Sequence, residues 1–122
     1  MYAEDIKKLT KENTNFRMVL HTGAHSQIVA MNIPVGGDIG EEVHPDTDQM
    51  LFFVDGEGEA ILAGEARKVE EHDVVFVPAG TVHNFKNVGN DDLKLFTVYA
   101  PPAHKDGTVH RTKEEAEKEE HG

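Results

Sequence analysis

Four side chains in the middle of the sequence have the types and spacing that a metal site requires. Glu42 and His44 are two residues apart, so an extended backbone would direct both side chains to the same face. Gln49 opens one alternating segment after a turn, and His83 opens a later one after a second turn. Two imidazoles, a carboxylate and an amide oxygen that converge would suit Fe(II), Mn(II), Zn(II) or Ni(II). Spacing alone is a weak signal, because Glu-x-His pairs occur by chance in many proteins.

Short strands must position these side chains. Apolar and polar residues alternate from about residue 16 to residue 99, and turn residues interrupt the alternation at regular intervals. The expected strands span residues 16–21, 26–33, 48–54, 59–62, 66–69, 73–77, 83–87 and 93–99. Strands this short and this closely spaced predict an antiparallel sandwich or barrel, and they argue against a βαβ fold.

The two ends of the chain differ from the central strands. Residues 1–15 are polar and predict an N-terminal arm or a short helix. In the C-terminal segment 101–122, Thr112 and Glu115 have the spacing of a capping box and predict the start of a charged helix. A chain of 122 residues suits one domain, so we expect one barrel over residues 16–100 between these two segments.

The glycines and the proline around the four side chains resemble the two motifs of the cupin family. The first motif, G-x5-H-x-H-x3-4-E-x6-G, is similar to Gly36-x5-Glu42-x-His44-x4-Gln49-x6-Gly56. The second, G-x5-P-x-G-x2-H-x3-N, is similar to Pro78-x-Gly80-x2-His83-x3-Asn87. The motifs span residues 36–87, and the flanking strands extend the likeness to most of the chain. The resemblance implies an all-β fold, the antiparallel double-stranded β-helix (cupin barrel or jelly roll), with a metal near its centre and short terminal helices.

Three positions depart from the family motifs. Glu42 stands for the first histidine, Gln49 for the glutamate, and His72 for the glycine that opens the second motif. We expect His72 to adopt the left-handed backbone conformation of that glycine and not to bind metal. The resemblance then implies one divalent ion (Fe, Mn, Zn or Ni) held by Glu42, His44, Gln49 and His83. This set is similar in kind to that of the metal-dependent phosphomannose isomerases, although Gln49 could instead orient a metal-bound water.

Charge and composition restrict the partners. The formal net charge of −11 repels nucleic-acid phosphates and anionic lipid, so neither nucleic acid nor a membrane is expected as a partner. The absence of cysteine excludes disulfides and thiolate chemistry. No apolar run approaches the roughly 20 residues that span a bilayer, and residues 1–5 do not resemble a signal peptide. We therefore expect a cytoplasmic protein whose partner is a small-molecule ligand or substrate.

Strand alternation also separates an inner from an outer face. If Gln49 faces inward, Leu51 and Phe53 do too, whereas Phe52 and Val54 face outward. From His83 the same rule points two further side chains inward, Phe85 and Asn87. An apolar stripe on the outer face indicates a homodimer, and the alternative is that the N-terminal arm covers it.

Several other polar side chains are less well determined by the sequence. Tyr99 could reach the interior, but its direction depends on strand register, and His25 could reach the mouth of the barrel. A structural role is the simpler interpretation of both. Because His104, His110 and His121 follow the barrel strands, we expect them on the surface.

The sequence leaves three functions open. The first is a metal-dependent enzyme on a small oxygenated, sugar-like or carbonyl substrate, either an isomerase that transfers protons or an iron-dependent dioxygenase. The second is a non-enzymatic module that binds a small ligand or a metal, and the third is a barrel whose polar site is only structural. The likeness to phosphomannose isomerases favours isomerisation. Against a sugar phosphate, the arginines Arg17, Arg67 and Arg111 are scattered in sequence.

Overall fold

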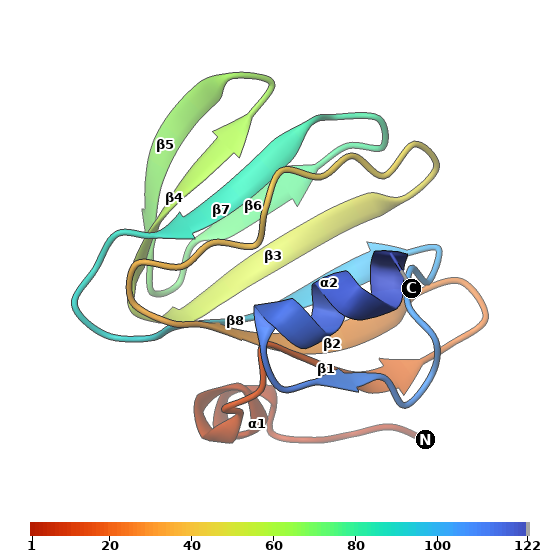
Figure 1. The fold of residues 1–122 in the computed structure, drawn as a ribbon. Helices are drawn as coiled ribbons and strands as arrows, with labels where there is room; N and C mark the ends of the chain where they lie inside the picture. The colour runs from red at the N-terminus through yellow and green to blue at the C-terminus, as the bar shows by residue number, and fades with distance from the viewer. Residues whose placement is uncertain (122) are drawn as a thin grey trace.

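The computed structural model describes residues 1–121, and the side chains of residues 1–119. Within this range nine strands and two helices make up the fold (Figure 1). The elements in order are α1 (Ile6–Glu12), β1 (Arg17–Thr22), β2 (Gln27–Ile33), β3 (Asp48–Asp55), β4 (Glu57–Leu62), β5 (Glu65–Glu70), β6 (Val74–Val77), β7 (His83–Asn87), β8 (Leu93–Ala100), β9 (Val109–His110) and α2 (Lys113–His121).

The strands form two antiparallel sheets that face each other (Figure 1). The larger sheet has the order β6-β3-β8-β2-β1-β9, and the smaller has the order β5-β4-β7. All eight predicted strands are present, with ends within two residues of the expected ones, and the predicted all-β double-stranded β-helix is confirmed. The short strand β9 was not predicted. It pairs with β1 through Arg17–His110 and Met18–Val109 and extends the larger sheet.

The interior changes from apolar to polar along the strands. At one end, Leu93 and Leu95 of β8 face the core together with their neighbours on β2 and β3. At the other end, the cross-strand row is Gln27, Tyr99 and Gln49, and all three side chains are buried. The predicted inward direction of Gln49, Leu51, Phe53, Phe85 and Asn87 is confirmed, because each is buried. The polar end of the barrel is therefore the end at which chemistry can occur.

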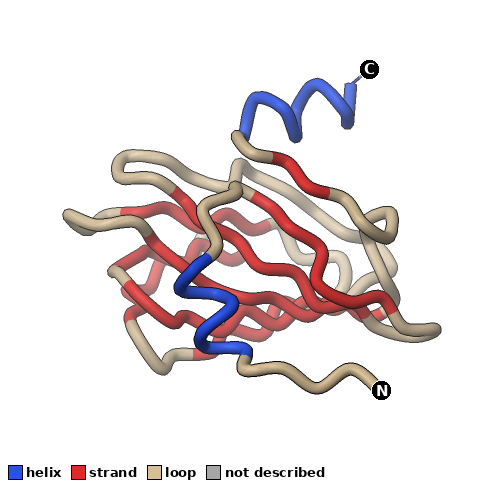
Figure 2. Tube along the Cα trace, turned by 90° about the horizontal axis from the view of Figure 1, so that it is seen from below, coloured by secondary structure: helices blue, strands red, loops and turns tan. Residues whose placement is uncertain are grey.

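The N-terminal arm covers part of the outer face of the larger sheet. Phe52 of β3 stacks on Phe96 of β8 there, with ring centroids 4.8 Å apart. Helix α1 contacts β8, β3 and β2 and lies across this face in Figure 2. The Lys94 Nζ of β8 donates to the carbonyl oxygens of Lys11 and Asn13, both at 2.8 Å, and fixes the end of the helix. Coverage by the arm is thus observed, and the homodimer remains a prediction.

The C-terminal helix begins where the capping box predicts. The Glu115 N–H donates to Thr112 Oγ1 at 3.2 Å, whereas the Glu115 carboxylate accepts from the Arg111 N–H, one residue before the expected partner. Ala116 of α2 is buried in the core, so the helix packs on the barrel. Neither helix in the described part of the chain combines the length and apolar character needed to cross a membrane.

Two turn glycines differ only in the space that a side chain would find. Both have positive φ, +90° at Gly56 and +82° at Gly64, but an added Cβ would lie 2.6 Å from the Asp92 carbonyl oxygen at Gly56 and would meet no described atom within 4 Å at Gly64. We expect Gly64→Ala to lower the free energy of unfolding by about 1–2 kcal/mol, from backbone strain alone. Gly56→Ala should cost about 2 kcal/mol more, because the β8 backbone must shift. Equal losses in chemical denaturation would contradict this close packing.

Candidate metal centre

A reciprocal backbone pairing brings Glu42 and His83 together. The Glu42 N–H donates to the His83 carbonyl and the His83 N–H donates to the Glu42 carbonyl, both at 2.9 Å. Residues that exchange hydrogen bonds in this way lie directly opposite each other, with both side chains on the same face. The segment that leads into β3 is therefore fastened to the start of β7 where the two candidate ligands lie.

A second tie positions His44. Its carbonyl oxygen accepts from the Gly80 N–H at 2.8 Å, and the neighbouring Ala79 N–H donates to Asp48 Oδ1 at 2.9 Å. The turn before β7 is thus held from two sides. The ring centroids of His44 and His83 are 5.5 Å apart. One ligand atom from each of Glu42, His44 and His83 lies within 4.8 Å of the other two, so the structure brings these three predicted residues together.

The hydrogen bonding of His83 leaves one ring nitrogen for a metal. Its Nδ1 lies 2.9 Å from the Thr81 carbonyl oxygen. Because a carbonyl only accepts, Nδ1 must carry the hydrogen and Nε2 keeps its lone pair. The Nε2 atom is buried and has no hydrogen-bond partner among the described side chains. A backbone carbonyl on the far nitrogen is the usual support of a metal-binding histidine.

Gln49 lies in the row of buried side chains that ends the barrel, next to Tyr99. Its Nε2 donates to Thr97 Oγ1 at 3.1 Å, while its Oε1 is buried without a hydrogen-bond partner in the part of the chain described. Its cross-strand neighbour Tyr99 meets His44 edge to face, with ring centroids 5.8 Å apart. The direction of Gln49 is confirmed. Its role as a ligand remains a prediction.

A divalent ion fits this donor set. Leaving a buried nitrogen or oxygen unsatisfied costs about 1–3 kcal/mol, and an ion would remove that cost for His83 Nε2 and Gln49 Oε1. Two imidazoles, a carboxylate and an amide oxygen are ligands that first-row divalent ions accept. Among the described residues, Glu42, His44 and His83 form the one group of histidine and acidic side chains with this geometry.

The prediction that His104 and His110 lie on the surface is wrong. The segment after β8 folds back and adds β9 to the larger sheet, so His110 is 5% exposed and the His104 Nε2 atom is buried. The His110 Nε2 lies 2.6 Å from the Glu119 carboxylate of α2. The side chain of His121 falls outside the described ones. His25 is exposed, and Tyr99, whose direction was left open, faces the interior.

Sequence reasoning missed Arg17 as an interior residue. It is 2% exposed, its Nη1 donates to His110 Nδ1 at 3.4 Å, and its guanidinium lies 5.4 Å from the centre of the Phe16 ring. The alternation with buried Val19 in the same strand was the available signal. Burial lowers the pKa of His104 to about 3, and the charge of Arg17 is the next cause.

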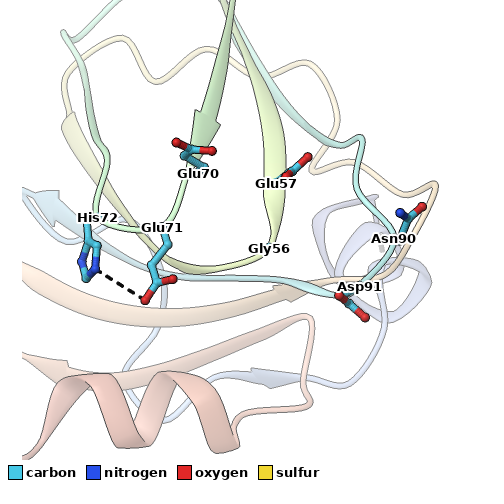
Figure 3. Close-up of a pocket in the computed structure, with 7 residues that line it drawn as sticks. All are labelled: Gly56, Glu57, Glu70, Glu71, His72, Asn90 and Asp91. Carbon is cyan, nitrogen blue, oxygen red and sulfur yellow. Dashed lines mark ion pairs between the residues drawn. The ribbon is translucent and has the colours of Figure 1, made fainter.

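A separate cavity of about 440 Å³ lies at the opposite end of the strands. Figure 3 shows the residues that line it: Gly56, Glu57, Glu70, Glu71, His72, Asn90 and Asp91. Its carboxylates belong to turns and strand ends. The His72 Nε2 lies 3.5 Å from the Glu71 carboxylate, and both side chains are exposed to solvent. The predicted left-handed backbone of His72 is confirmed by its φ of 77°. Gly56 follows β3 at the end remote from Gln49, so this acidic cavity is distinct from the candidate metal centre.

Comparisons with known proteins agree with the fold and the motifs. A model of the cupin domain family matches residues 29–99. The uncharacterised protein YrkC of Bacillus subtilis is 43% identical over 122 residues, which cover 94% of this chain and 65% of YrkC. The chain thus spans slightly less than two thirds of the length of that relative.

Solved structures extend the likeness. BH2720 of Bacillus halodurans superposes with a TM-score of 0.95 and is 41% identical, over 96% of this chain and 93% of that one. A protein of Thermotoga maritima described as a predicted oxalate decarboxylase superposes with a TM-score of 0.60 and is 26% identical, over 62% of this chain and 66% of its own. On its motifs, its fold and these matches, the chain belongs to the cupin family.

Proposed function

We propose that this protein binds one divalent metal ion through Glu42, His44 and His83, with Gln49 as the fourth donor. The observation that carries the proposal is the convergence of three ligand atoms within 4.8 Å of one another. Support comes from the His83 ring, whose tautomer is fixed by Thr81 and whose Nε2 is buried. One carboxylate against a divalent ion leaves a net charge of about +1 at the centre.

We propose further that the centre serves an isomerase-type proton transfer on a small oxygenated substrate, sugar-like or carbonyl. A bound ion would act as a Lewis acid on a carbonyl or hydroxyl oxygen. In this proposal the protein supplies Tyr99, which is buried with its ring edge on His44, as the group that moves a proton. Leu51 and Thr97 close the interior below the polar row and restrict the substrate to a small molecule. The relative described as a predicted oxalate decarboxylase supports a small oxygenated ligand.

Metal content tests the centre directly. We expect the wild type, freed of affinity tag, to retain about one divalent ion per chain after dialysis, and His44→Ala and His83→Ala to bind it more than about 100-fold more weakly, since even indirect contacts to metal ligands contribute 10–100-fold. Elemental analysis and metal titration measure both effects. His25→Ala removes an exposed histidine and serves as the matched control. If the wild type holds no more metal than the doubly substituted protein, the proposal fails.

The role of Gln49 can be tested by charge. Gln49→Glu keeps the shape and adds a carboxylate, and we expect it to raise metal affinity by about tenfold or more, as the ligand charge count generally does. In the metal-free state the same variant should be less stable than the wild type, because a carboxylate would be buried beside Thr97 without a cation. Calorimetric titration and thermal unfolding measure the two effects. Unchanged metal affinity would place Gln49 outside the ligand shell.

Tyr99→Phe tests the proposed proton transfer. Metal content should stay at the wild-type level, while aldose–ketose turnover by the metal-loaded protein should fall by about 100-fold or more, the usual size of a general acid–base effect. Tyr2→Phe is the matched control, because Tyr2 stacks on His21, which is not one of the candidate metal ligands. Oxygen uptake with diketones or catechols, without isomerisation, would instead indicate a dioxygenase. Ligand binding without any turnover would indicate a binding module.

A further inference from the structure

His104 lies next to the candidate metal centre without belonging to it. Its ring meets Tyr99 edge to face, with centroids 5.1 Å apart, and Tyr99 meets His44 in the same way on the metal side. The His104 Nε2 is buried, and it has no hydrogen-bond partner among residues 1–119. It is not part of the group whose ligand atoms converge at Glu42. Metal binding in this group therefore does not explain why a buried His104 nitrogen is left without a hydrogen bond.

One buried amide holds the His104 backbone against the barrel. Gln27 Oε1 accepts from the N–H groups of His104 at 3.0 Å and Ala103 at 3.3 Å. Its Nε2 donates to the His104 carbonyl at 2.7 Å and to Thr22 Oγ1 at 2.9 Å. Gln27 itself is buried in the same cross-strand row as Tyr99. Three of these hydrogen bonds therefore hold the backbone of residues 103–104 against the barrel, and the fourth, to Thr22, holds Gln27 itself.

The surroundings determine the charge state of His104. Burial lowers its pKa to about 3, and the nearby Arg17, His44 and His110 lower it further. The ring is consequently neutral at neutral pH and offers one N–H donor and one lone pair. A divalent ion held by the single carboxylate of Glu42 would leave a net charge of about +1 at the neighbouring centre, which favours an anionic ligand.

We propose that His104 Nε2 hydrogen-bonds the ligand of the metal centre, and that this ligand is a small anion with two oxygen groups, such as a 2-hydroxycarboxylate. One oxygen group would lie at the metal and the other at His104. The inference rests on the proposed function, since it requires an ion at Glu42, His44 and His83. It adds a substrate-binding residue from the segment after β8, and it specifies the charge of the ligand.

Glycolate is the probe, and the cobalt-loaded protein provides the signal. The visible absorption of Co(II) reports a ligand that enters its coordination shell, without any turnover. We expect glycolate to perturb the wild-type spectrum, and His104→Ala to bind it at least about tenfold more weakly, the loss expected for a hydrogen bond to a charged group. His104→Gln, which retains a donor and an acceptor, should recover most of that loss. His25→Ala, at an exposed position, should behave as the wild type.

Cobalt content by elemental analysis separates this inference from the proposed function. Equal cobalt in all variants with weaker glycolate binding by His104→Ala supports the inference. Equal cobalt with unchanged glycolate affinity overturns it, and so does a wild type whose spectrum glycolate leaves unaltered. Ethylene glycol has two oxygen groups and no charge, so equal affinity for it would overturn the anionic ligand class. A wild type that binds no cobalt would overturn the proposed function itself, together with this inference.

Discussion

The reciprocal hydrogen bonds between Glu42 and His83 are the constraint on which the polar end of the barrel depends. They fasten the segment that leads into β3, in the larger sheet, to β7 in the smaller one. The hydrogen bond from the Gly80 N–H to the His44 carbonyl makes a second connection between the turn before β7 and the segment before β3. Because backbone groups make both sets of hydrogen bonds, the backbone by itself directs the side chains of Glu42, His44 and His83 toward one another. The backbone therefore holds the three candidate ligands close together before any ion binds.

The polarity gradient inside the barrel explains why the centre lies at this end. Leu93 and Leu95 belong to the hydrophobic core, which supplies the hydrophobic stabilisation of the fold. Two rows further along β8, Tyr99 has Gln27 on one side and Gln49 on the other. Such buried polar groups need partners, and Gln27 finds them in the backbone of residues 103–104. Gln49 Oε1 has none among the described residues, and under the proposed function the metal ion is its partner.

The alternation of the sequence predicted the strands and the direction of side chains within each strand. It predicted little of what depends on the pairing register between strands. Alternation located eight strands and the inward direction of Gln49 and Phe85, because each strand carries that information by itself. The direction of Tyr99 required the pairing of β8 with its neighbours, which no single strand specifies. His104 and His110 were misplaced for a related reason: residues 101–110 have no periodic pattern, and they reach the barrel through contacts with Gln27 and Arg17 that are distant in sequence.

These contacts between residues distant in sequence involve the part of the chain that the family model does not match. The family model matches residues 29–99, and Arg17, Gln27 and His104 fall outside that range. The matched region contains the four candidate metal donors, whereas the unmatched flanks contain the buried guanidinium, the amide clamp and the extra imidazole. Because a fold hosts many chemistries and the surroundings of the metal select among them, ligand choice should follow the flanks more than the motifs. Under the proposed function, a relative that keeps the motifs but lacks the equivalents of Gln27 and His104 should therefore keep the metal donors and bind a different ligand.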